Sequence, residues 1–97
     1  MGVDFLGDAE LRKQIVKHLD EETYRFSDHS IEEMHEDHFD FHDIIYVLRY
    51  GTHARDKDTL KIDHWRYAIE GRAQNGKRAR VIVKLQKELL IITVFKI

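Results

Sequence analysis

Several residue types are missing from this chain of 97 residues, and each absence narrows what the chain can be. It has no cysteine, which excludes a disulfide framework, a thiol nucleophile and a cysteine-ligated zinc site. It has no proline and only five glycines, so composition marks no linker. Its longest apolar run, residues 89–92, is far shorter than the roughly 20 residues of a membrane-spanning helix. No secretory signal is visible, so we expect one cytoplasmic domain over residues 1–97.

The charge of the chain is divided between its two halves. Residues 1–48 hold 13 Asp and Glu against 4 Lys and Arg, whereas residues 49–97 hold 5 against 12. The small net charge of −2 therefore hides an acidic half followed by a basic half. Such a division is typical of a surface that attracts polyanions, although charge runs are also ordinary solvated faces.

The first half of the chain has helical periodicity. A first helix is expected after Asp8, which is a plausible N-cap, with its apolar residues at Leu11, Ile15, Val16 and Leu19. Residues 24–26 could form a short strand. A second helix is expected to open at Ser27 or Asp28 and to turn Ile31 and Met34 inward.

The start of a third helix carries the clearest local pattern. Asp40 and Asp43 have the spacing of a capping box, and Phe39 and Ile44 have that of a hydrophobic staple. Gly51 is expected to end this helix at the usual C′ position.

After Gly51 the period changes to two, which indicates strands. Asn75-Gly76 alone suggests a two-residue turn, but that register would mix apolar and polar faces. A three-residue loop over 74–76 keeps one face apolar, because side-chain period fixes register where a face is buried. This loop pairs Ile69 with Val81 and Glu70 with Arg80. It places on one buried face the side chains of Trp65, Tyr67, Val81 and Val83.

The opposite face of this hairpin gathers basic side chains: His64, Arg66, Arg72, Arg78, Arg80 and Lys84. The last run, 89–95, is apolar on both faces apart from Thr93, which predicts a central strand. Residues 52–58 could add a short edge strand. The fold class expected is α+β, with two or three N-terminal helices packed on a mostly antiparallel sheet.

An ordered set of short motifs runs through residues 24–97. It comprises Phe26-Ser27-Asp28-His29, Met34, Leu48 to Gly51, Ile69-Glu70-Gly71-Arg72, the Asn-Gly-Lys turn and the run 91–95. In this layout the chain resembles a family of small bacterial domains of unknown function related to BrnT toxins and, more distantly, to the RelE/ParE-like fold. The resemblance implies a toxin of a type II toxin-antitoxin pair that cleaves mRNA and is neutralised by a cognate antitoxin. Residues 1–23 would be an N-terminal extension containing a helix.

Two positions depart from that pattern. Relatives carry Arg where this chain has Glu33 and Asp37. The loss of two helix cations favours a rival interpretation, a non-catalytic module that binds RNA or an acidic protein partner through the basic sheet face.

The chemistry of metal-free RNA cleavage selects the candidate residues. It needs an acid and a base, for which histidine is suited, and cations for the phosphorane charge. His64 on the basic face and His29 at the family position are the candidate acid or base, and Arg80 is the candidate phosphate stabiliser. Each histidine also has an ordinary structural interpretation, as a cap or a surface residue. The remaining nucleic-acid contacts are assigned to Arg66, Arg72, Arg78 and Lys84.

A second group of histidines lies among acids. His35, His38 and His42 have the wrong spacing for a zinc-protease motif, and a helix start at Asp40 separates the last from the others. A solvated acidic surface is the favoured interpretation, and neither a metal site nor a cofactor is predicted.

Overall fold

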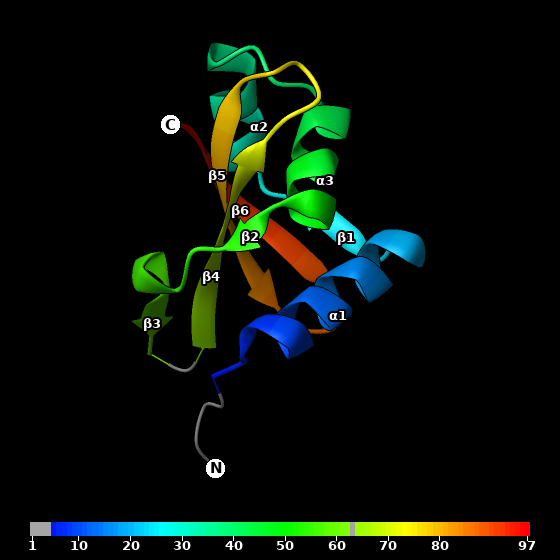
Figure 1. Cartoon of the computed structure of the whole chain (residues 1–97), viewed down its shortest axis with the longest axis vertical. Coiled ribbons are helices and arrows are strands. Elements are labelled where there is room, and N and C mark those ends of the chain that lie inside the picture. The colour runs from blue at the N-terminus through cyan, green and yellow to red at the C-terminus, as the bar shows by residue number, and fades with distance from the viewer. Residues whose placement is uncertain (1–4, 63) are drawn as a thin grey trace.

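The computed structural model describes residues 5–62 and 64–97. Three α-helices, six strands and one 3₁₀ turn follow one another in these residues (Figure 1). They are α1 (Asp8–Asp20), β1 (Tyr24–Phe26), α2 (Asp28–Glu36), α3 (Phe41–Tyr50), β2 (Thr52–His53), η1 (Arg55–Lys57), β3 (Thr59–Lys61), β4 (His64–Arg72), β5 (Arg78–Leu85) and β6 (Leu89–Lys96). The expected α+β class, with the helices mainly first and the sheet last, is confirmed.

The strands form one mixed sheet in the order β1-β6-β5-β4-β2, and β3 pairs with β4 beside β2. All the strand pairs except one are antiparallel, as predicted. The exception is β1, which pairs in parallel with the first half of β6. The last strand is therefore interior to the sheet, between β1 and β5.

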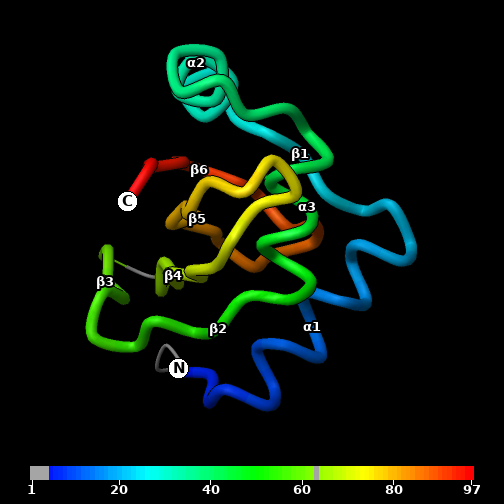
Figure 2. The backbone as a smooth tube through the Cα atoms, turned by 45° about the horizontal axis from the view of Figure 1, so that its top comes forward, coloured from blue at the N-terminus to red at the C-terminus, as the bar shows by residue number. Residues whose placement is uncertain are grey.

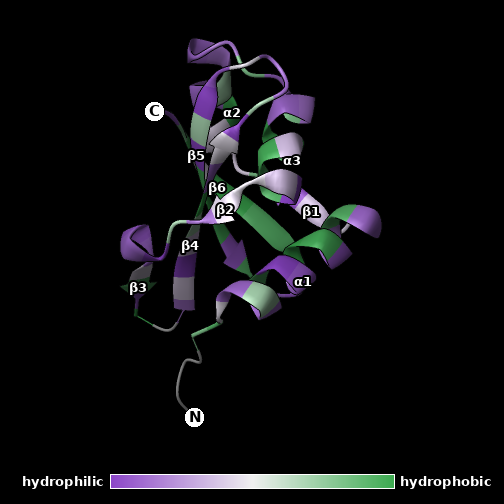
Figure 3. Cartoon of the chain, in the orientation of Figure 1, coloured by the Kyte–Doolittle hydropathy of each residue, from purple (hydrophilic) through white to green (hydrophobic). Residues whose placement is uncertain are grey.

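The helices are distributed unequally around the sheet. Figure 2 shows α1 and α3 side by side on one side of β4 and β5, with α2 beyond β6. The core lies between α1, α3 and the strands, and Figure 3 shows hydrophobic colouring on β6 and on α1. Its fully buried side chains include Leu11, Ile15, Ile44, Val47, Val81, Val83, Leu89, Ile91 and Val94.

The β4–β5 hairpin has the register that alternation predicts. Ile69 lies opposite Val81, and Glu70 lies opposite Arg80. Ala73 N donates to Lys77 O, which leaves a three-residue loop over 74–76, with Gly76 at φ +88°. Tyr67, Val81 and Val83 are buried on one face, as expected. Trp65 is only half-buried, because that end of β4 pairs with Leu60 of β3 instead of lying deep under a helix.

The helix caps confirm some sequence predictions and correct others. The capping box of Asp40 and Asp43 forms with both hydrogen bonds, and Ser27 caps α2 through Ser30 N. Asp8 is not the N-cap of α1. The N-cap is Gly7, and the Asp8 side chain reaches His53 instead.

The expectation that Ile31 turns inward is wrong, since Ile31 is 40% exposed while Met34 is buried. The apolar face of α2 is narrow because this short helix packs mainly against β6, whose second half has no pairing with β1.

Gly51 ends α3 without the left-handed conformation that is common at the C′ position. Its φ is −76°, so that conformation is not needed. A Cβ here would lie 2.5 Å from Val47 O and 2.6 Å from Glu70 O. A Cβ on Gly71 would in turn lie 3.0 Å from the Cα of Gly51. The two glycines allow the end of α3 to approach β4 closely, and this contact fixes where β2 begins.

Candidate functional site

The basic side chains lie on the side of the sheet opposite α1 and α3. We call the outer face the surface of β4, β5 and β6 that carries Arg66, Glu70, Arg72, Arg78, Arg80, Ile82, Lys84 and Phe95. These residues share a face because partners directly across the ladder point the same way, and residues two apart on one strand do so as well. His64 also belongs to this face by its register.

The cations of the outer face differ in the contacts that they already make within the protein. Arg80 Nε donates to Glu70 Oε2 at 2.6 Å, and both side chains are mostly buried. Arg72 donates to the carbonyl of Gly76 within the hairpin loop and remains exposed. Arg66 and Lys84 are half-buried, and Arg66 Nε has no hydrogen-bond partner in the described residues. Arg80 is thus largely neutralised by its carboxylate.

Arg72 and Arg78 are directly opposite each other at the loop end of the hairpin. Like charges in a cross-strand pair destabilise a sheet, so this pair is not explained by stability. Both side chains are exposed, and the Asn-Gly turn beside them is held against the α2–α3 connection, where Asn75 donates to Asp43 and to the carbonyl of His38. Such a pair is well placed to be neutralised by an anionic ligand.

An aromatic ring of β6 lies on the same face as these arginines. Phe95 of β6 is the partner of Arg80 across the ladder and is 42% exposed. The carbonyl of Arg78 accepts from Ile97 N, which holds the end of β6 against the same end of β5. The outer face therefore combines guanidinium groups with an accessible aromatic surface, a pairing that suits nucleotide bases on a phosphate backbone.

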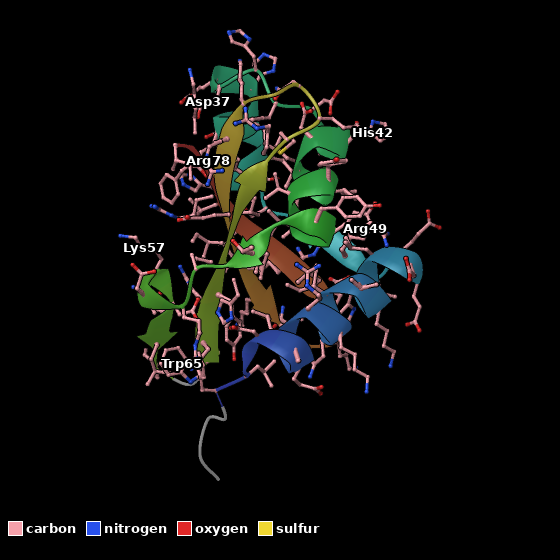
Figure 4. The ribbon with its side chains drawn as sticks, in the orientation of Figure 1. Asp37, His42, Arg49, Lys57, Trp65 and Arg78 are labelled. Carbon is pink, nitrogen blue, oxygen red and sulfur yellow. The ribbon has the colours of Figure 1, made fainter. Side chains whose placement is uncertain are left out.

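The two candidate histidines are far from each other. His64 begins β4, six residues before Glu70, so it lies about 20 Å along the strand from the Arg80 pair. Figure 4 shows this separation, with Arg78 near one end of the hairpin and Trp65, the neighbour of His64, near the other. The structure does not bring His64 and Arg80 to one phosphate.

His29 lies at the same end of the sheet as Arg80. Its Nε2 is 3.4 Å from Oε1 of Glu33, and Val94 N donates to that same oxygen at 2.9 Å. Val94 precedes Phe95, which faces Arg80. His29 is 66% exposed in its side chain, so it is accessible to solvent at this end.

Glu33 and Asp37, where the resemblance led us to expect arginine, have contacts within the fold, Glu33 through its side chain and Asp37 through its backbone. Glu33 satisfies the outward N–H of Val94, where β1 no longer covers the edge of β6. Asp37 ends α2, and its carbonyl accepts from Lys77 Nζ at 3.1 Å. The Glu33 side chain therefore protects this edge of β6.

Sequence reasoning missed a buried polar cluster around His53. Its Nδ1 lies 2.7 Å from Asp8 Oδ1, and its Nε2 lies 2.5 Å from Asp58 Oδ2. Asp58 also accepts from Ala68 N at 2.8 Å, in the gap between the β2 and β3 ladders. The only sequence sign was a histidine just after Gly51 with an acid five residues later, and Asp8 is too distant in sequence to be connected with it.

Tyr67 extends this cluster toward the N-terminus. Its hydroxyl accepts a hydrogen bond from Leu6 N at 3.0 Å. Burial raises the pKa of Tyr67 above its ordinary value of 10.0, and the nearby Asp58 carboxylate raises it further, against the opposing effect of the Leu6 hydrogen bond. The ring of Phe5 packs on both Trp65 and Tyr67. The N-terminal segment is therefore tied to β4 and β2 by polar and aromatic contacts.

Comparison with known proteins identifies the domain. The model of a family described as a domain of unknown function, DUF4258, matches residues 26–96. The chain belongs to this family. The DUF4258 span contains the outer face, His29 and His53, whereas α1 and Asp8 precede it. No curated protein and no solved structure matches the chain. The link to BrnT and RelE-type toxins remains an interpretation of the motif order.

Within residues 5–62 and 64–97, no group of three or more His, Cys, Asp or Glu side chains is placed to hold a metal ion. Among the same residues no helix combines the length and apolarity needed to cross a membrane.

Proposed function

We propose that this DUF4258 domain is a binding module that holds single-stranded RNA on its outer face without requiring cleavage. The observation that carries the proposal is the exposed, uncompensated pair of Arg72 and Arg78 on the same face as the accessible ring of Phe95. Phosphates would neutralise the arginines, and a base would stack on the ring. Arg66 and Lys84 would extend the cationic track along the same face.

Binding is favoured over catalysis by the way the candidate residues are arranged. A general acid or base must come within hydrogen-bond reach of the reacting group. His64 is remote from the arginine pair, and Arg80 is already paired with Glu70. The features that remain accessible at the hairpin end are those of a nucleic-acid platform.

One observation favours a second candidate function, a metal-independent endoribonuclease of the toxin type with a cognate antitoxin. His29, the residue at the family position, is exposed at the same end of the sheet as Arg80. In this mechanism the imidazole would accept the 2′-hydroxyl proton or protonate the leaving 5′ oxygen. Arg80 would stabilise the phosphorane only after it exchanged Glu70 for the phosphate.

The test of the binding function is fluorescence anisotropy with a labelled single-stranded RNA over about 50 to 200 mM salt. We expect affinity to fall steeply as salt rises, because each phosphate contact releases counterions. Replacing both Arg72 and Arg78 with Ala should flatten the slope of log affinity against log salt by about 1.4, at about 0.7 per lost contact. Phe95→Ser should weaken binding by about tenfold with little change in slope.

The matched control replaces Lys13 and Lys17 with Ala. These exposed cations lie on α1, so their loss changes net charge equally without touching the outer face. An equal loss of affinity in this control would mean that net charge alone attracts RNA. Absence of binding at low salt would exclude RNA and favour an acidic protein partner for the same face.

A further inference from the structure

The segment from Phe26 to Leu48 is acidic throughout and contains no Lys or Arg. Its seven carboxylates differ in their burial and in their contacts. Asp43 is buried in the capping box and also accepts from Asn75 N, and Glu33 holds the edge of β6. The others are not buried, and those that are exposed on α2 and at the start of α3 are Asp28, Glu32, Glu36 and Asp40.

An apolar pocket of about 160 Å³ opens in the middle of this acidic surface. Met34 and Phe39 are buried in it, and Ile31 and Phe41 are 40% and 49% exposed. The ring of Phe41 packs edge-on against Phe26 of β1, with centroids 4.8 Å apart. Large apolar side chains thus remain exposed at surface positions where polar or charged residues could stand without loss of stability.

The size of the pocket limits what it can hold. A cavity of about 150 Å³ lined by Leu, Ile and Phe binds benzene in an engineered protein core. The pocket between α2 and α3 therefore has room for one aliphatic or aromatic side chain. Asp40 and His35 complete its lining, and on α2 Asp28 lies three residues before Ile31 and Glu32 directly after it.

We propose that the pocket between α2 and α3 binds a basic amphipathic segment of a partner protein. One Leu, Ile or Phe of that segment would insert between Ile31 and Phe41, and flanking Lys or Arg side chains would lie against Asp28, Glu32 and Asp40. The sign of the partner's charge follows from the exposed carboxylates around the pocket, because an acidic or neutral partner would gain nothing from such a rim. These carboxylates outnumber Lys77, whose Nζ lies 5.9 Å from the ring centroid of Phe39. The site is separate from the outer face, which has the opposite charge.

The experiment uses three labelled peptides and the full chain. A short amphipathic Lys/Leu peptide should bind, whereas the same peptide with Ser for Leu, or with Glu for Lys, should bind at least tenfold more weakly, since burying one Leu side chain is worth about that factor. Ile31→Ser and Phe41→Ser should each weaken the Lys/Leu peptide by a similar factor. Ile62→Ser is the matched control, because Ile62 is fully exposed on another part of the surface.

The charged rim is tested without touching the pocket. The double variant Asp28→Asn/Glu32→Gln should weaken binding severalfold, and the equally charged double variant Glu21→Gln/Asp56→Asn should leave it unchanged. Arg78→Ala, on the outer face, should also leave it unchanged, so loss of RNA binding and loss of peptide binding are separable. Equal binding of the Leu and Ser peptides, or equal effects of both charge variants, would overturn the proposal.

Discussion

His53 Nε2 lies 2.5 Å from Oδ2 of Asp58, and the two side chains are only 4% and 2% exposed. The same ring contacts Asp8 through Nδ1, but the Asp8 side chain is 64% exposed. One imidazole therefore joins a buried carboxylate to a solvated one. It can donate to both only as the imidazolium, because a neutral ring has a single N–H.

The two contacts of His53 should contribute unequally to stability. His53→Ala removes a hydrogen-bond partner from the buried Asp58 carboxylate, and we expect the free energy of unfolding to fall by about 1–3 kcal/mol. Asp8→Asn removes only the exposed contact and should cost about 0–1 kcal/mol. Urea unfolding followed by circular dichroism at neutral pH measures both values. Equal losses would show that the buried half of the cluster is no stronger than the exposed half.

The close approach of α3 to β4 yields a second prediction. Gly51→Ala places a Cβ against two backbone carbonyl oxygens that cannot move independently. We expect a loss of about 1–3 kcal/mol in the free energy of unfolding, as in other overpacked sites. Gly7→Ala is the control, since a Cβ there meets nothing within 4 Å, and as a change of N-cap it should cost about 0.5 kcal/mol. Equal losses of unfolding free energy in the two variants would mean that α3 and β4 move apart easily to accommodate the added Cβ.

Tyr67 gives the chain a distinct alkaline titration. Its raised pKa means that the folded protein keeps the phenol proton at a pH where the unfolded chain has lost it. The stabilisation from Tyr67 is therefore complete below pH 10 and declines as the pH rises above that value. Ultraviolet titration should show one of the four tyrosines ionising later than the others, and Tyr67→Phe should remove that late phase. A late phase that persists in Tyr67→Phe would assign it to another tyrosine.

Local rules predicted those parts of the fold that depend on local contacts. The capping box at Asp40 needs only residues three apart, and the three-residue loop at 74–76 follows from alternation along two adjacent strands. The register then placed Glu70 against Arg80, as the hydrogen bond confirms. These features were available from sequence because each one depends on a few neighbouring residues or on a single hairpin.

Contacts between distant segments overrode local rules elsewhere. Asp8 has the chemistry of an N-cap, but its carboxylate instead contacts a histidine 45 residues away. Ile31 has inward spacing on α2, but α2 packs mainly against β6 and buries only a narrow stripe. The separation of His64 from Arg80 was available from the predicted register, because six residues of extended strand span about 20 Å. The sequence therefore predicted which residues share the outer face, whereas the contact of Asp8 and the exposure of Ile31 depend on how distant segments pack.

The positions of the two histidines allow the catalytic candidate to be tested sharply. If the purified protein cleaves RNA, His29→Ala should reduce the rate by about 10²–10⁴-fold, the usual contribution of a general acid or base. His64→Ala should stay within a few-fold of wild type, since this residue lies about 20 Å along β4 from the Arg80 pair. Single-turnover cleavage of a labelled RNA, separated on a denaturing gel, measures both rates.

The same assay can reject the histidine mechanism. Glu33→Gln keeps the shape of the side chain and should still accept from Val94 N, while it removes the negative charge beside His29. We expect this change to leave thermal stability close to wild type and, if His29 is catalytic, to lower the rate far less than His29→Ala does. If neither histidine variant lowers the rate, cleavage would have to depend on the arginine cluster alone. If wild type binds RNA and leaves it intact, the domain is a binding module, as we propose.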